Sequence, residues 1–158
     1  MVRKWDKVSS EFLIKNKIFK LREDKVISPK KQTEHPVWVI DTPNWVNIIP
    51  ITVDNEVILV NQHRFGTEQL TLEIPGGMVD EGEDPMIAAS RELAEETGYT
   101  STQIIEIGRV EPNPALMSNY TYSYLALNAS QTTEQKPDGT EDIEILKRHI
   151  DEIPLMIE

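Results

Sequence analysis

The sequence contains no cysteine among its 158 residues. This absence excludes a disulfide framework and any zinc site built on cysteine ligands. The chain also lacks an apolar run near the roughly 20 residues of a membrane-spanning helix. Its charged first residues, Met1 to Asp6, have no apolar segment behind them and do not form the pattern of a signal peptide. The composition therefore predicts a cytoplasmic protein with no membrane partner.

Basic residues are scarce outside the N-terminal end. The net charge is -11, yet residues 1–35 contain ten Lys or Arg against five Asp or Glu. An acidic body disfavours non-specific binding to nucleic acid, so no nucleic-acid partner is expected. A small anionic substrate, bound through metal ions and a few arginines, remains compatible with it. The basic segment is either a nucleic-acid arm or the solvated face of a small sheet, and its interleaved apolar residues favour the sheet.

The N-terminal segment has the pattern of a small strand unit. Residues 11–27 are rich in strand-forming side chains, and the polar group Arg22-Glu23-Asp24 predicts a hairpin turn between two strands. A third strand is expected at 37–41, before a break at 42–44. This part of the chain therefore predicts a hairpin-like unit with one added strand.

The middle of the chain predicts a stronger hairpin. Strands at 45–52 and 57–61 flank the turn-forming pair Asp54-Asn55. Pro50 lacks a backbone N–H and therefore predicts an edge position or a bulge. A further short strand at 69–74 leads into a Pro-Gly-Gly loop.

The remaining segments predict one helix followed by more strands. The helix is expected to begin at Pro85, with Asp84 as its N-cap and Gly98 just past its end. Strands are expected at 103–110 and at 121–127. A polar loop is expected at 129–140, and either a strand or a helix at 143–150. This order predicts an α/β or α+β fold with a mixed sheet.

Three glutamates and an arginine gather on one face of the expected helix. At about 100° per residue, Glu92, Glu95 and Glu96 span an arc of roughly 100°. Carboxylates this close repel one another unless a cation lies among them, and hard divalent cations prefer oxygen ligands. A solvated acidic helix face is the alternative. The Gly-Gly loop before the helix and the embedded Arg91 favour the metal site.

The spacing of these residues resembles the signature of the Nudix hydrolases. The match runs over 23 residues from Gly77 to Tyr99 and reads Gly, five residues, Glu, seven residues, then Arg-Glu-Leu-Ala-Glu-Glu-Thr-Gly-Tyr. Seven identities at fixed spacing make it far more specific than a short motif. These positions are Gly77, Glu83, Arg91, Glu92, Glu95, Glu96 and Gly98.

The resemblance implies a fold and a division of the chain. It implies a Nudix-type α/β/α sandwich with a mixed sheet over residues 43–158, plus an antiparallel strand unit over residues 1–42. In relatives such a unit covers a partner subunit, so a homodimer is expected. The family's closing C-terminal helix would begin near Glu158, and a truncated or disordered tail is expected there.

The resemblance also implies metal-dependent catalysis. Mg²⁺ is the expected cofactor, with Mn²⁺ as a substitute. The implied ligands are the backbone oxygen of Gly76 and the carboxylates of Glu92 and Glu96. Glu95 is expected to share in metal binding or catalysis, and Arg91 to orient the carboxylates by ion pairing.

Two further acidic positions follow from the resemblance. Glu83 is expected to be an orienting partner rather than a weak metal ligand. The general base of close relatives often comes from a loop after the last central strand, outside the signature. Glu141 fits this role best because it follows the polar loop, and Asp142 and Glu144 are the alternatives. The alternative interpretation is that all three are surface acids.

The segments around Arg64 and Glu73 look like the ADP-ribose and nucleoside-diphosphate-sugar branch of the family. In that branch the arginine binds a diphosphate and the glutamate lies beside the site. Trp45 is expected either to stack on a base or to lie in the core or in a dimer contact. A later proline-rich loop is similar to a loop that defines the branch, which makes Asn113 and Met117 candidates for substrate binding.

The predicted reaction is therefore the hydrolysis of a nucleoside diphosphate sugar, such as ADP-ribose, to a nucleoside monophosphate and a sugar phosphate. The proline-rich loop has Pro114-Ala115 where Pro-Gly is usual, which leaves other nucleotide sugars open. One alternative is a Nudix hydrolase of a dinucleoside polyphosphate or a nucleoside triphosphate. The other is a nucleotide-binding module without turnover, and the complete set of glutamates argues against it.

Overall fold

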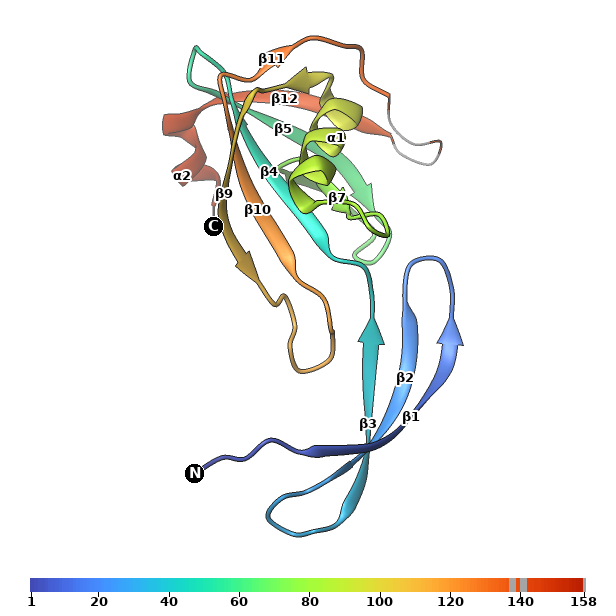
Figure 1. The fold of residues 1–158 in the computed structure, drawn as a ribbon. Helices are drawn as coiled ribbons and strands as arrows, with labels where there is room; N and C mark the ends of the chain where they lie inside the picture. Colours follow the sequence, from blue (N-terminus) through green and yellow to red (C-terminus); the bar gives the residue numbers. More distant parts are fainter. Residues whose placement is uncertain (137–138, 140–141, 158) are drawn as a thin grey trace. The chain divides into compact units, whose positions relative to one another are not determined.

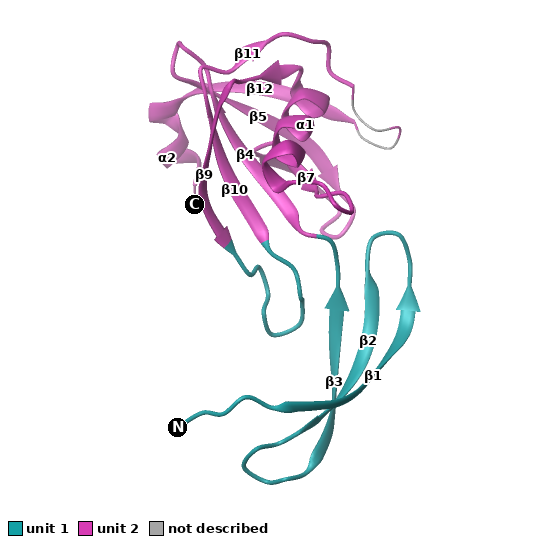
Figure 2. Cartoon of the chain, viewed as in Figure 1, with its two compact units in different colours: residues 1–43, 110–120 teal, residues 44–109, 121–158 magenta. Residues whose placement is uncertain are grey.

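The structure is a computed structural model that describes residues 1–136, 139 and 142–157. The chain forms two compact units (Figure 2). The first contains residues 1–43 and 110–120, and the second contains residues 44–109 and 121–158. The loop at 110–120, which the sequence groups with the larger domain, thus belongs to the first unit.

The first unit is a three-stranded antiparallel sheet in the order β1-β2-β3 (Figure 1). Its strands are β1 (Asp6–Lys15), β2 (Lys20–Ile27) and β3 (Glu34–Asp41). The loop at 110–120 joins this sheet through backbone hydrogen bonds, from Ile40 N–H to the carbonyl of Leu116 (2.8 Å) and from Ser118 N–H to the carbonyl of Ile40 (3.2 Å).

The predicted turn at Arg22-Glu23-Asp24 is wrong, because these residues lie in the middle of β2. The chain turns earlier, where the side chain of Asn16 accepts the backbone N–H groups of Ile18 and Phe19, each at 2.8 Å. Arg22 forms ion pairs with Asp24 and with Asp41 of the neighbouring strand. The pair along β2 and the pair across to β3 stabilise extended backbone at a position where local composition favours a turn.

The second unit contains a seven-stranded mixed sheet whose main path runs β12-β5-β4-β10-β9, with β6 beside β5 and β7 beside β4. Strands β4 and β10 are parallel, whereas β5 pairs antiparallel with β4, β6 and β12. The predicted α/β fold with a mixed sheet and an N-terminal antiparallel strand unit is confirmed. The strands of this sheet are β4 (Trp45–Ile51), β5 (Glu56–Arg64), β6 (Gln69–Glu73), β7 (Gly76–Met78), β9 (Gln103–Val110), β10 (Thr121–Leu127) and β12 (Ile143–His149).

Pro50 lies neither at a sheet edge nor at a recorded bulge, but in the central strand β4. Ile48 donates its backbone N–H to the carbonyl of Pro75 (2.9 Å), on the side of β4 away from β10. Successive amides alternate in direction along a strand, so the missing N–H of Pro50 falls on that same side. There β4 pairs with β5 only at Ile51 and Val57, so the proline interrupts no ladder.

The helix α1 (Pro85–Thr97) has the boundaries that its sequence predicts. The side chain of Asp84 accepts the N–H of Met86 at 2.9 Å, and Gly98 ends the helix with a φ of 72°. The helix covers one face of the sheet (Figure 1). Its fully buried Ala88, Ala89 and Leu93 form the core of this unit with side chains of β4, β5 and β10.

Short elements complete the second unit. Strands β8 (Tyr99–Thr100) and β11 (Ser130–Gln131) form a small separate sheet after the helix. After β12 the chain continues into η1 (Ile150–Glu152) and α2 (Ile153–Met156), so the segment at 143–150 is a strand that leads into helical turns. In the described part of the chain, no helix is long and apolar enough to cross a membrane.

Candidate active site

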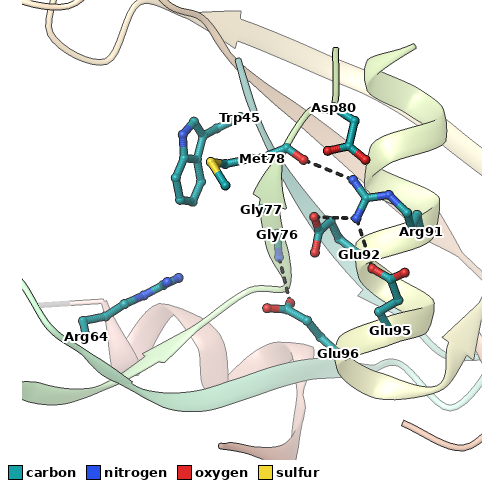
Figure 3. A pocket seen from close by; sticks show the side chains of 10 residues that line it. All are labelled: Trp45, Arg64, Gly76, Gly77, Met78, Asp80, Arg91, Glu92, Glu95 and Glu96. Atoms are coloured by element: carbon teal, nitrogen blue, oxygen red, sulfur yellow. Dashed lines mark hydrogen bonds and ion pairs between the residues drawn. The ribbon is translucent and has the colours of Figure 1, made fainter. Parts of the chain in front are cut away.

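A cavity of about 320 Å³ opens in the second unit where α1 faces β7 and the start of β4 (Figure 3). Acidic, basic and apolar groups all contribute to its wall. Its lining consists of Trp45, Arg64, Gly76, Gly77, Met78, Asp80, Arg91, Glu92, Glu95 and Glu96. It therefore combines the signature residues on the helix with residues from three strands.

The three helix glutamates face this cavity in different ways. Glu96 is only 3% exposed, and its carboxylate accepts the backbone N–H of Gly76 at 3.0 Å. The side chain of Glu92 is 14% exposed and that of Glu95 is 46% exposed. Burial thus increases from Glu95 through Glu92 to Glu96, the member bonded to the glycine loop.

Arg91 connects the acidic side chains on one side of the cavity. It forms a bidentate ion pair with Glu83, with both N–O distances at 3.0 Å. Its Nη1 also contacts Glu92 at 2.8 Å and Glu95 at 3.0 Å, and its Nη2 donates to the carbonyl of Met78 at 3.1 Å. These contacts join Arg91 to three carboxylates, and the orienting roles of Arg91 and Glu83 stay a prediction.

The same network shifts the acidity of its members. The bond to Glu83, together with Glu92 and Glu95, raises the pKa of Arg91 above its ordinary value. In return Arg91 lowers the pKa of Glu83, although burial alone would raise it. Both groups therefore stay charged throughout the physiological range, and the acidic cluster keeps one permanent internal cation.

Two glycines make the approach of helix and strand possible, each for a different reason. A Cβ on Gly77 would lie 2.5 to 2.8 Å from the Glu92 carboxyl group. A Cβ on Gly76 would instead overlap the backbone carbonyl oxygen of Val46 in the neighbouring strand. Gly77 therefore leaves space for the Glu92 carboxylate, whereas Gly76 leaves space for the strand pair β4–β7.

Arg64 reaches the cavity from the β5–β6 hairpin. It forms a bidentate ion pair with Glu73, at 2.8 and 2.6 Å, and the hydroxyl of Thr71 also donates to Glu73. The bond from Arg64 lowers the pKa of Glu73 despite the opposing effect of burial. Glu73 lies outside the cavity lining. The side chain of Arg64 points toward β7 (Figure 3).

The opposite wall of the cavity is apolar. Trp45 and Met78 are partners in the register of β4 and β7, and their side chains lie next to each other in Figure 3. An indole ring and a thioether offer a flat, polarizable surface suited to contact with an aromatic ring. The cavity thus has an apolar wall and a carboxylate-rich wall.

The donor groups of the cavity fit a hard divalent cation. Glutamate oxygens and a backbone carbonyl are the ligand types that such cations prefer. Among the described residues, however, no three acidic or histidine side chains already converge in a metal-ligand geometry. Arg91 contacts Glu92 and Glu95, and Gly76 contacts Glu96, so these contacts occupy oxygens that a cation would use.

Several predicted site residues are not among those that line the cavity. Asn113 and Met117 lie in the loop of the first unit, where the Asn113 carbonyl accepts the N–H of Met117 at 2.7 Å, and their role stays a prediction. Glu141 lies outside the described residues. Of its alternatives, Glu144 is a β12 residue that accepts a hydrogen bond from Asn61 at 3.1 Å, and Asp142 is exposed.

Two lining residues, Met78 and Asp80, were missed at the sequence level. Both fall inside the signature segment but at positions that its spacing leaves variable. The only available signal was their proximity in sequence to Gly77, since Met78 enters the wall through its pairing with Trp45. Pairing between distant strands cannot be read from a helix-based motif.

Comparisons with known proteins identify the family of this chain. A family model described as "NUDIX domain" matches residues 42–154. The "Methanol dehydrogenase activator" of Bacillus methanolicus is 30% identical over 146 residues, which cover 92% of this chain and 78% of that protein. The "ADP-ribose pyrophosphatase" of Bacillus subtilis (strain 168) is 29% identical over 121 residues, which cover 76% of this chain and 65% of the relative.

A solved structure extends the likeness to the fold. The crystal structure of an ADP compounds hydrolase superposes with a TM-score of 0.85 at 21% sequence identity. The superposition covers 100% of this chain and 85% of the other. At this level of identity the likeness concerns the arrangement of the elements.

Proposed function

Because the chain belongs to the Nudix family of pyrophosphohydrolases, we propose that it hydrolyses the pyrophosphate bond of a nucleoside diphosphate sugar. ADP-ribose is the first candidate, and the products are a nucleoside monophosphate and a sugar phosphate. The family typically uses a divalent metal, and we propose Mg²⁺ here, with Mn²⁺ as a substitute. We further propose that the enzyme acts in the cytoplasm.

One observation carries this proposal. A single cavity contains the carboxylates of the helix signature, the arginine of the β5–β6 hairpin and an aromatic side chain. A nucleoside diphosphate sugar needs these three features together, because it presents a diphosphate between an aromatic base and a polar sugar. Arg64 supplies a planar donor for phosphate oxygens, and Trp45 with Met78 supplies a surface for a base.

The residues have distinct proposed roles. The backbone oxygen of Gly76 and the carboxylates of Glu92 and Glu96 would hold the metal, with Glu95 shared between binding and catalysis. A bound cation neutralises phosphate charge and lowers the pKa of the attacking water. Arg91 prevents mutual repulsion of the carboxylates and fixes their orientation.

A general base must remove a proton from the attacking water. We propose Glu141 for this role, with Asp142 and Glu144 as alternatives. Glu144 already accepts a hydrogen bond from Asn61, which holds it against β5. This contact restrains Glu144 and therefore favours Glu141 or Asp142 as the general base. Separate Glu-to-Gln and Asp-to-Asn variants at the three positions identify the base as the one whose loss removes the acid limb of the kcat profile.

A substrate panel tests the proposed specificity. ADP-ribose, GDP-mannose, a dinucleoside polyphosphate and a nucleoside triphosphate are compared with Mg²⁺ and with Mn²⁺, and the products are identified. The proposal expects the highest kcat/KM for a nucleotide sugar. A preference for the triphosphate or the dinucleoside polyphosphate would replace it with another Nudix activity.

The Glu96→Gln variant tests whether the cavity is the active site. Glutamine keeps an acceptor for the Gly76 N–H but removes the charge, so we expect kcat/KM to fall at least about 100-fold. Glu68→Gln, an exposed acid outside the cavity, serves as the control. An unchanged rate in a folded Glu96→Gln protein would contradict the assignment, and no turnover in the parent chain would support a binding module.

We also propose that residues 1–42 are a dimerisation unit and that residues 43–158 are the hydrolase domain. Support comes from large apolar side chains in and beside the three-stranded sheet that are 44 to 50% exposed, because exposed apolar surface of this kind is typical of interaction sites. The clearest cases are Trp5, Phe12, Leu13, Ile14 and Trp38. Sedimentation that detects only monomer at all concentrations would remove this proposal.

A further inference from the structure

The strand β9 ends the main path of the mixed sheet, with β10 on its inner side. In the described part of the chain, no strand pairs with its outer side. It is eight residues long and contains three isoleucines and a valine. Ile105, Ile107 and Val110 are 49, 52 and 59% exposed. A long edge of this kind presents a row of backbone donors and acceptors next to apolar side chains.

The other long edge strands of the protein are protected. At the opposite end of the same sheet, β12 carries Lys147 and Arg148 among its seven residues. In the first unit, β1 has lysines at both ends of its ladder and two register irregularities, and β3 contains Pro36. Lysine, proline and irregular register are the features that block pairing between sheets. β9 contains neither lysine nor proline, and its charged residues are one of each sign, Glu106 and Arg109.

We propose that β9 pairs antiparallel with β9 of a second copy of this chain, around a two-fold axis at Ile107. The mixed sheet then continues from one copy into the other. This inference does not depend on the proposed reaction, and its contact differs from that proposed for residues 1–42.

Symmetry and charge select this register. Side chains that lie directly opposite each other in an antiparallel pair point to the same face, so a two-fold axis must pass through one residue position. An axis at Glu106 or at Arg109 would place like charges opposite each other, which is unfavourable. Axes at Ile105 and at Gly108 would pair only residues 103–107 and 106–110, whereas an axis at Ile107 pairs residues 104–110.

The chosen register also matches the side chains. Ile107 lies opposite its own copy, and Ile104 lies opposite Val110. Glu106 lies opposite Gly108. A Cβ added to Gly108 would have no atom within 4 Å, so the space beside this glycine is open. Arg109 lies opposite Ile105, and its guanidinium carbon is 5.8 Å from the centroid of the Tyr122 ring in its own chain. The pairing therefore buries aliphatic side chains without bringing like charges into direct opposition.

The absence of cysteine makes this proposal directly testable. In the Ile107→Cys variant the two cysteines face each other across the axis with Cα atoms about 4.5–5.5 Å apart, within the range of a disulfide. Mild oxidation of the full-length variant, followed by non-reducing electrophoresis, should convert most of the protein into a covalent dimer.

Ile105→Cys is the matched control, because it has the same residue type, the same strand and nearly the same exposure. The register places its two copies about 13 Å apart, four residues along the strand, so it should cross-link at least about tenfold more slowly. The double variant Ile105→Cys/Arg109→Cys brings unlike positions together and should cross-link again. Equal rates for the two single variants, or no dimer from Ile107→Cys, would overturn the proposal.

A second measurement does not depend on disulfide geometry. Ile107→Lys introduces a charge of the kind that protects the other edges, and its position is exposed, so the fold should remain intact by circular dichroism. Sedimentation velocity over a concentration series should then give either half the assembly mass of the parent chain or a clearly higher dissociation constant for self-association. An assembly whose mass and dissociation constant both stay unchanged would overturn the contact, whatever the contribution of residues 1–42.

Discussion

At the scale of a residue, Arg91 places a positive charge among closely spaced acids. Glu83, Glu92 and Glu95 all lie within 3.0 Å of its guanidinium. Without it, carboxylates at this spacing would repel one another. The same arginine also bonds to the carbonyl of Met78, so it links the helix to β7. Orientation of the carboxylates and attachment of the glycine strand thus depend on one side chain.

Gly76 and Gly77 should respond differently to replacement by alanine. At Gly77 the added methyl meets the movable end of Glu92, so Gly77→Ala should change the free energy of unfolding by less than about 1 kcal/mol and lower the apparent affinity for Mg²⁺. At Gly76 it meets backbone, so Gly76→Ala should cost about 2 kcal/mol or more. Chemical denaturation and metal titration of both variants measure the two effects. Equal destabilisation would contradict the distinction.

The Arg64–Glu73 ion pair should give a pH-dependent share of stability. The pKa of Glu73 is lowered from 4.5, so this share is fully present above about pH 4.5 and is lost as the pH falls through the lower folded-state value. Both side chains are partly exposed, so its size should be roughly 0.2–1 kcal/mol.

The free energies of unfolding of the parent chain and of Glu73→Gln, measured with denaturant, should therefore converge as the pH is lowered from 7. Thr71→Val, which removes only the neighbouring hydroxyl, should raise KM for a diphosphate substrate while leaving this convergence in place. A difference between parent and Glu73→Gln that stays constant with pH would show that the ion pair does not contribute.

At the scale of an element, α1 is defined by local chemistry at both ends. Asp84 caps its first turn, and Gly98 takes a left-handed conformation beside the carbonyl of Thr133. Because Glu92, Glu95 and Glu96 lie on this helix, any fraying at either end displaces groups that line the cavity. The caps therefore serve the site as well as the fold.

Loss of the N-cap side chain should destabilise the fold moderately, and replacement of Gly98 at the end of the helix should destabilise it strongly. Asp84→Ala should lower the free energy of unfolding by about 1 kcal/mol, the usual value of an N-cap side chain. Gly98→Ala should cost more, because it combines an unfavourable positive φ with overlap against backbone. Asp84→Asn, which keeps the acceptor, is the control. A larger loss for Asp84→Ala than for Gly98→Ala would contradict this order.

At the scale of the whole molecule, charge is unevenly distributed. The net charge is -11, although the first 35 residues have an excess of basic side chains. The acidic remainder includes the cavity, where a divalent cation would offset several carboxylates at once. Binding of such a cation to the folded state alone must raise stability by mass action.

Mg²⁺ should therefore raise the melting temperature of the protein. At about 100 times its Kd the gain is about 2.7 kcal/mol, or roughly 5–10 °C for a chain of this size. Glu96→Gln should remove most of this shift, whereas Glu134→Gln, at an exposed position outside the cavity, should retain it. Scanning calorimetry with and without Mg²⁺ measures the effect, and an unaltered melting temperature in the parent chain would argue against a metal site in the cavity.

Predictions from the sequence were most accurate where a structure depends on near neighbours. The ends of α1, the grouping of its glutamates and the contacts of Arg91 with Glu92 and Glu95 follow from spacings within one helix. The turn near Arg22 and the placement of Pro50 were wrong because both depend on distant strands. Asp41 stabilises β2 at Arg22, and the narrow contact between β4 and β5 accommodates Pro50.

The sequence by itself determined the family signature, the helix that carries it and the class of fold, since a helix of fixed rise places residues i, i+3 and i+4 on one face whatever surrounds it. Only the tertiary structure decided that Arg64, Trp45 and Met78 share a cavity with that helix. Their meeting depends on strand register, which is fixed by pairing between segments far apart in the chain. The sequence could not predict the exposed edge of β9 either, because strand order also depends on pairing between distant segments.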